Sequence, residues 1–354
     1  MGIIFTTMEA VKKRDSNIEL FRIIAMLLIV AHHYVVNSGI TQIIAEPPYT
    51  WHTYFLYLFG MWGKIGINCF VLITGYFMCT ADISLRKFLR LLLEIWFYNI
   101  AIYAAFVISG YEPVSFSGIY AALLPLASVE KNFATCFLIY YLLIPYLNIL
   151  IQHCSQKQHM TLLAICLLFF VVLDHLPQYY YLFNYVEWFC ILHIIASYIR
   201  FYGPKQISSK HVGGLILGGI VLAMGSVVFQ LVLKALGSPL GIGGPYFWVE
   251  DSNALIAVIS SLMLFMGFKH MKIAYHKWIN VIASSMFGVL LIHANSDAMR
   301  RWLWVDTCHN TDWIYSAYLP LHAVGCTLAV FLACILIDRI RMLLVKLIQK
   351  AKAA

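Results

Sequence analysis

The sequence predicts an all-α polytopic membrane protein with about ten transmembrane helices and both termini in the cytoplasm. Of its 354 residues, 62% are hydrophobic and only 11% are charged, and the mean hydropathy is +0.81. That is too little polar surface to cover a soluble globule of this size. Apolar runs and short connectors take up the whole length, so we expect a single integral-membrane domain over residues 1–354.

The expected spans are apolar runs of about twenty residues, the length of helix that crosses a bilayer. They cover residues 17–37, 54–79, 87–109, 133–152, 159–176, 183–202, 212–236, 251–269, 279–298 and 315–345. The segment 115–127 is short and contains Pro125, so we expect a re-entrant or interfacial piece there. The first run is too long for a signal peptide and lacks a cleavage site, which indicates an uncleaved first span.

Basic residues set the expected orientation, because cytoplasmic loops carry an excess of Lys and Arg. With the N-terminus inside, eighteen Lys and Arg fall on the inner side and five on the outer side, with Arg22 set aside. The inner group includes Lys12, Lys13 and Arg14 ahead of the first run. Adding or removing one span inverts half of the loops and destroys this bias.

The charge and the cysteines exclude several classes of function. The net charge of +8 comes from residues spread over many short loops, so nucleic acid is not an expected partner. The nine cysteines are an odd number, and most lie inside apolar runs, where cysteine behaves as a small hydrophobic residue. With no C-x-x-C pair and no Cys/His cluster at zinc spacing, we expect neither a disulfide framework nor a metal site.

The run 17–37 carries Arg22, His32 and His33 inside an apolar segment. Placing an ionisable side chain inside a membrane-spanning helix costs free energy, so such a residue indicates a functional role. Arg22 and His33 are almost three helical turns apart, about 16 Å of rise, so both project from one face. His32 points about 100° away from them. A simpler interpretation makes Arg22 an interfacial anchor paired with Glu19, and His33 a partner in an interhelix hydrogen bond.

This arginine and histidine, with ten residues between them in the first span, resemble the signature of the acyltransferase-3 family of integral membrane enzymes. Three further stretches are similar to motifs of that family. They are GINCFVLITGYF at 66–77, SLRKFLR at 84–90 and SSMFGVLLIH at 284–293.

The resemblance implies a membrane-bound acyltransferase. The expected donor is cytoplasmic acyl-CoA, with acetyl-CoA as the first expectation, and the acyl group would pass to a hydroxyl of a cell-envelope glycan or its lipid-linked sugar precursor. The implied location is a bacterial inner membrane, where membrane lipids surround the multi-pass chain. Acyl-CoA would serve as a co-substrate, without a metal.

Four basic residues are expected to bind the donor. Arg22 would hold the diphosphate at the inner mouth, because the guanidinium fork matches phosphate oxygens. Arg86, Lys87 and Arg90 would bind the adenosine phosphates, and by resemblance Lys87 and Arg90 match the family's basic pair. Alternatively, this cluster only sets the orientation of the chain in the membrane, as basic residues of cytoplasmic loops commonly do. His33 is the expected general base, since an imidazole takes and releases protons near neutral pH.

Other polar residues within the spans could support His33. His293, in a span of the same direction, is expected at the depth of His33, and Asp297 one turn later is expected to orient its ring. Glu187 lies near the outer end of its span, where an acceptor would arrive. Glu94 lies near the inner end and could pair with the basic loop. The alternative for His293 is a packing role near the outer surface. The alternative for Glu187 and for Glu94 is a place in a buried ion pair.

Two other functions compete with the enzyme. Charges within the membrane also mark the solute path of a transporter, although the chain shows no similarity between its halves. A scaffolding membrane protein is the other possibility, and it predicts that Arg22 and His33 tolerate replacement by alanine.

Overall fold

The computed structural model describes residues 15–124, 133–176, 184–241 and 243–353, and all regular structure in these ranges is helical. The predicted all-α class is therefore confirmed. The N-terminal basic residues Lys12, Lys13 and Arg14 lie outside the described residues, as do the last three residues of the 115–127 segment.

The helices follow the order of the expected spans, with short helical pieces between them. They are α1 (Ser16–Val36), α2 (Ile40–Ile43), α3 (Trp51–Gly60), α4 (Gly63–Met78), α5 (Leu85–Ile108), α6 (Phe116–Leu123), α7 (Phe133–His153), α8 (Gln156–Leu167), η2 (Leu168–Val172), η3 (Leu173–His175), α9 (Tyr185–Tyr202), α10 (Ser209–Ala235), α11 (Leu255–His270), α12 (Lys277–Ala283), α13 (Met286–His293), α14 (Asp297–Arg301), η4 (Trp302–Thr307), η5 (Asn310–Trp313) and α15 (Leu319–Ala353).

Within the described residues, seven helical segments are long and apolar enough to cross a membrane, or eight if a bent pair counts as one span. Each of the remaining expected spans also coincides with a helix, namely α9 and the shorter apolar helix α11. The multi-pass helical architecture is therefore confirmed, while the count of ten and the position of the termini stay predictions. The eight-residue α6 is too short to cross, as expected for its segment.

The expected span 279–298 is not one straight helix. The segments Lys277–His293 and Asp297–Thr307 meet at an angle of 97°. Ser296 causes the new start, because its hydroxyl accepts a hydrogen bond from the Met299 amide at 3.1 Å and caps α14. The prediction of a continuous span is wrong here, because a cap residue directly before an acidic residue favours a helix start over continuation.

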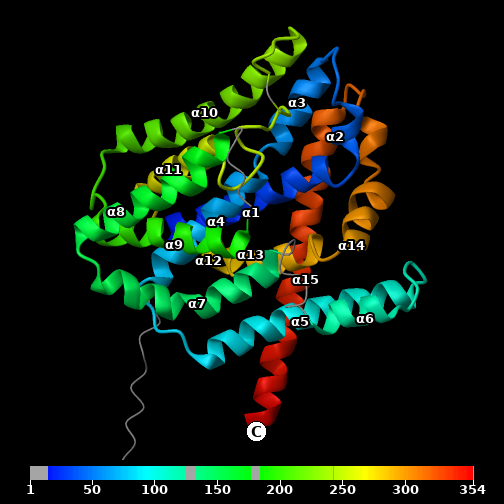
Figure 1. Cartoon of the computed structure of the whole chain (residues 1–354). Coiled ribbons are helices and arrows are strands. Elements are labelled where there is room, and N and C mark those ends of the chain that lie inside the picture. Colours follow the sequence, from blue (N-terminus) through cyan, green and yellow to red (C-terminus); the bar gives the residue numbers. More distant parts are fainter. Residues whose placement is uncertain (1–14, 125–132, 177–183, 242, 354) are drawn as a thin grey trace, which may run out of the picture.

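Helix α1 lies in the middle of the bundle, with α10 and α11 on one side and α5 and α6 on the opposite side (Figure 1). It packs closely on α4 because two glycines of α4 face it. A Cβ atom on Gly66 would lie 2.9 Å from the Ala25 carbonyl oxygen, and one on Gly63 would lie 2.3 Å from the His32 ring. Small residues allow helix backbones to approach in this way, and here they bring α4 against the histidines of α1.

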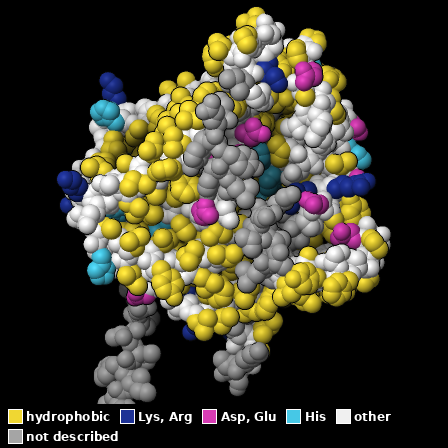
Figure 2. Space-filling model, in the orientation of Figure 1, with side chains coloured by type: hydrophobic (Ala, Val, Ile, Leu, Met, Phe, Trp, Pro, Cys, Tyr) yellow, Lys and Arg dark blue, Asp and Glu magenta, His cyan; other side chains and the backbone are white. Residues whose placement is uncertain are grey.

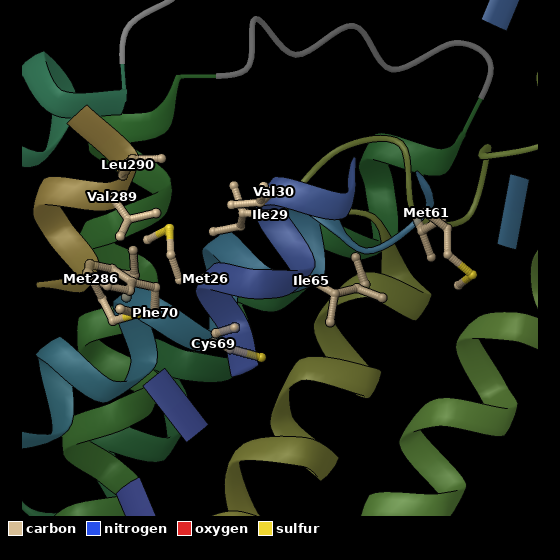
Figure 3. Packing of buried hydrophobic residues seen from close by; sticks show 14 of the residues in the cluster. Met26, Ile29, Val30, Met61, Ile65, Cys69, Phe70, Met286, Val289 and Leu290 are labelled. Carbon is tan, nitrogen blue, oxygen red and sulfur yellow. The ribbon is translucent and has the colours of Figure 1, made fainter. Parts of the chain in front are cut away.

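The apolar residues divide between an interior and a surface. In the interior, α1, α4 and α13 contribute facing side chains such as Met26, Cys69 and Val289 (Figure 3). The surface is also dominated by hydrophobic side chains (Figure 2), and large ones are exposed along α5, α10 and α15. Apolar surface on both sides of the helices is expected when lipid replaces water as the solvent.

A buried ionic network joins α5 to α15. Arg341 lies 2.8 Å from Glu94 and 2.7 Å from Asp338, and Asp338 also accepts a hydrogen bond from the Tyr98 hydroxyl at 2.8 Å. The expectation that Glu94 pairs with the basic loop at the start of α5 is therefore wrong. Its partner is Arg341 of α15, near the far end of the chain, so the alternative of an ion-pair partner is the one that the structure supports for Glu94.

Replacing Arg341 with alanine should strongly destabilise the protein. The change leaves Asp338, whose side chain is fully buried, without its cation, and losing one partner of a buried ion pair costs about 3–5 kcal/mol. The midpoint of thermal unfolding in detergent would measure the loss. Lys346→Ala, on the exposed part of α15, is the matched control and should leave the midpoint unchanged. Equal midpoints for both variants would contradict a stabilising network.

Candidate active site

A cavity of about 370 Å³ lies at the carboxyl end of α1. Its wall is built from α1, α4, α5, α7, α9, α13 and α14 with their adjoining turns. The polar lining residues are His32, His33, Asn37, Lys64, Asn99, Tyr185, Asn295 and Arg300. A cavity of this size with a few convergent polar groups is typical of a small-molecule site.

Two histidines from distant parts of the chain meet at this cavity. His33 Nδ1 lies 3.0 Å from His293 Nε2, and the His293 ring is fully buried. The structure thus brings together the two residues that were expected at equal depth. Their catalytic roles stay predictions.

The hydrogen bonds of this pair assign a tautomer to each neutral ring. His293 Nδ1 lies 2.6 Å from the Val289 carbonyl oxygen, one turn back on α13. A carbonyl oxygen only accepts, so His293 carries its proton on Nδ1 and its Nε2 is an acceptor. His33 must then donate from Nδ1 to that nitrogen. This leaves Nε2 of His33 with an available lone pair, as a general base requires.

Asp297 does not orient His293. The bend after α13 directs α14 away, and the Asp297 side chain is 98% exposed and lies 3.1 Å from Arg300. The prediction is wrong because it assumed a helix continuing through residue 297. The Val289 carbonyl orients the ring instead, the second-shell contact that a carboxylate or a backbone carbonyl often supplies to an imidazole.

Sequence reasoning missed the two cations of this cavity. Lys64 donates to the Tyr185 hydroxyl at 2.6 Å and lies 4.0 Å from Asp251, and Arg300 reaches the cavity from α14. Among the described residues that line it, none is an Asp or a Glu. The sequence did contain an indication of these two cations. Lys64 and Arg300 are among the few Lys and Arg that the orientation count places on the outer side.

The cavity also contains donors that lack a partner within the described residues. The Asn37 side-chain amide nitrogen and Arg300 Nε are buried and make no hydrogen bond. By contrast, Asn295 donates to Asn99 at 2.9 Å. Buried unpaired donors are costly and uncommon in native proteins. A ligand oxygen in the cavity would satisfy them.

The predicted donor-binding residues lie elsewhere. The Arg22 guanidinium is 3.2 Å from Glu19, as the simpler interpretation expected, and Arg22 is not among the residues lining the His33 cavity. The cluster at the start of α5 (Arg86, Lys87 and Arg90) is exposed. Glu187 is exposed in the first turn of α9, two residues after Tyr185, which lines the cavity.

Fold and site together define a helical membrane protein in which a half-buried His33 and a fully buried His293 form an imidazole pair beside a cationic cavity. The sequence model of the acyltransferase-3 family, described as an acyltransferase domain, matches residues 15–339, and the chain belongs to this family. The suspected resemblance is thereby confirmed, and the match favours an enzyme of acyl transfer over a transporter or a scaffold. Comparisons with curated proteins and with solved structures give no match.

We expect His293 and Asp297 to respond differently to substitution. His293→Ala removes the acceptor of His33 Nδ1, and loss of such an orienting contact typically lowers activity about 10–100-fold. Asp297→Asn should change the acyl-transfer rate less than about threefold, because Asp297 is exposed and does not contact the ring. Initial rates of the two purified variants measure the difference. A larger loss in Asp297→Asn would contradict the assigned orientation of the ring.

Proposed function

We propose that this protein transfers an acyl group, acetyl in the first instance, from cytoplasmic acyl-CoA to a hydroxyl of a cell-envelope glycan or its lipid-linked precursor. Its location would be a bacterial inner membrane. The observation that carries the proposal is the relay from the Val289 carbonyl through His293 to His33, which leaves one basic nitrogen at a cavity. Family membership supplies the class of reaction.

His33 would act on the acceptor hydroxyl. Its Nε2 takes the proton while the hydroxyl oxygen attacks the thioester carbonyl carbon, and the carbon–sulfur bond then breaks. The proton passes from the imidazolium to the departing thiolate, so the products are an O-acyl ester and a free thiol. His33 keeps its Nδ1 hydrogen bond to His293 throughout, because Nδ1 carries a proton in both states. An acyl-imidazole intermediate would use the same nitrogen as the nucleophile.

Hydrogen-bond donors that line the cavity would stabilise the negative charge that develops on the carbonyl oxygen. Lys64, Arg300 and the Asn37 amide line the same cavity as His33, and two of them have buried nitrogens without a partner among the described residues. Donors placed in advance at a developing oxyanion need no reorganisation during the reaction. Removing one such donor typically costs about 10²–10³ in kcat.

Donor and acceptor would reach this cavity from opposite ends of α1. His33 lies near the carboxyl end of the helix, and Arg22 lies about 16 Å of helical rise closer to its start. Arg22 and the α5 cluster of Arg86, Lys87 and Arg90 are candidates for the donor phosphates on the expected cytoplasmic side. Glu187, near the cavity on α9, is a candidate for the acceptor side.

Turnover of acetyl-CoA by the purified protein tests the proposal. His33→Ala should lower the rate of thiol release about 10²–10⁴-fold, the usual contribution of a general base, while the affinity for the donor stays within about twofold. His32→Gln is the matched control, because His32 contacts the Gly60 carbonyl and packs on α4. Turnover in His33→Ala equal to that of the unmodified protein would overturn the assigned base.

Lys64→Met tests the stabilisation of the oxyanion. The change removes a cation from the cavity, and kcat should fall about 10²–10³-fold with a smaller change in KM. A rise in KM with an unchanged kcat would instead place Lys64 in ground-state binding. Steady-state rates over a range of acetyl-CoA concentrations separate the two outcomes.

A further inference from the structure

A second cavity, of about 440 Å³, lies at the opposite end of α1 from His33. The start of α1 and the carboxyl ends of α4, α9 and α11 meet there. Arg200, Lys205 and Lys269 contribute three cations to its lining, and Asp15 contributes the one carboxylate. These helix ends belong to the expected cytoplasmic side, so this cavity faces the compartment that holds nucleotides.

The cations are arranged around one aromatic ring. The Arg200 guanidinium lies 4.7 Å and the Lys269 ammonium 5.6 Å from the centre of the Tyr76 ring on α4. The Lys269 ammonium also contacts the Pro204 carbonyl oxygen at 3.3 Å. Within the described residues, no carboxylate lies at ion-pair distance from Arg200, Lys205 or Lys269. The positive charge of the cavity is therefore largely uncompensated by neighbouring side chains.

The cavity is held by contacts between helices. The Asn17 side-chain amide donates to the Phe268 and Lys269 carbonyl oxygens at 3.0 and 2.9 Å, which ties the start of α1 to the end of α11. Tyr76 packs on Phe265 of α11 with ring centres 5.6 Å apart. Cations near the carboxyl ends of helices are favourable in any membrane protein. The positive-inside rule alone, however, does not require these cations to line the same cavity.

The chemistry of this cavity matches phosphate. A guanidinium fork and two ammonium groups form short, charge-assisted hydrogen bonds with phosphate oxygens. A lone phosphate monoester would engage one or two of these groups, whereas a ligand with several phosphates could engage all three. The volume is in the range that holds a compact organic ligand.

We infer that this cavity binds the phosphate groups of the donor, namely the nucleoside phosphate part of acyl-CoA. The inference rests on the proposed function and changes one part of it. Arg200, Lys205 and Lys269, which line one cavity, rather than the cluster of Arg86, Lys87 and Arg90 at the start of α5, hold the nucleotide. The acyl end would then extend toward the His33 cavity at the other end of α1. Headgroups of anionic lipids carry the same phosphate chemistry, and the test separates the two sources.

Binding of coenzyme A to the full chain in detergent, measured by calorimetry, tests the assignment. Arg200→Gln and Lys269→Gln should each weaken binding about tenfold or more, since each removes a charge-assisted contact. Lys269→Arg keeps the charge and should stay within about threefold of the unmodified protein. Lys210→Gln, an exposed cation at the start of α10 that does not line the cavity, is the matched control and should stay within about twofold. Arg86→Gln tests the competing cluster on α5. Thermal midpoints of all variants verify that they are folded.

Three outcomes would overturn the inference. Unchanged affinity in the Arg200 and Lys269 variants, with a loss in Arg86→Gln, assigns the phosphates to α5 and leaves the proposed function intact. Displacement of coenzyme A by phosphatidylglycerol, in nanodiscs compared with neutral phosphatidylcholine nanodiscs, assigns the cavity to lipid headgroups. Failure of the proposed function looks different, because the unmodified protein then neither binds coenzyme A nor releases thiol from acetyl-CoA.

Discussion

The hydrogen-bond relay from the Val289 carbonyl to His293 and on to His33 is the interaction on which the candidate site depends. Each link restricts the next, because a carbonyl oxygen cannot donate and a neutral imidazole has one donor and one acceptor. Two helices must keep their relative positions for it to exist. The last turn of α13 supplies two of its members, and α1, which packs on α13 and α4 through the apolar core, supplies the third. His33, the proposed base, is thus oriented through His293 by a backbone carbonyl.

The membrane environment explains why the polar groups cluster. A charged or hydrogen-bonding side chain in lipid finds no partner, so such residues gather where helices shield them. In this protein they collect at the two ends of α1. One end carries the imidazole pair with Lys64 and Arg300, and the other carries Arg200 and its neighbouring lysines. A transfer between a donor from one side and an acceptor from the other requires such a division, with the reacting group near one end.

The bend between α13 and α14 decides which charged side chain of α14 lines the cavity. Because α14 turns away after His293, Asp297 becomes exposed while Arg300, one turn later, reaches the cavity. A continuous helix would have placed a carboxylate near the ring and carried Arg300 beyond it. The bend therefore exchanges a negative group for a positive one beside His33, which suits a reaction that develops negative charge on a carbonyl oxygen.

The sequence by itself determined the all-helical class and the apolar segments, and it indicated His33 and His293 as candidate site residues. These depend on local composition, helical periodicity and the resemblance carried by short motifs. Only the tertiary structure decided which groups meet. His33 and His293 are 260 residues apart, Glu94 pairs with Arg341 rather than with its neighbouring loop, and Lys64 reaches Tyr185. Such contacts depend on how the helices pack and where they bend. Helical periodicity predicts which face of a helix carries a side chain, but it does not predict which other helix that face contacts.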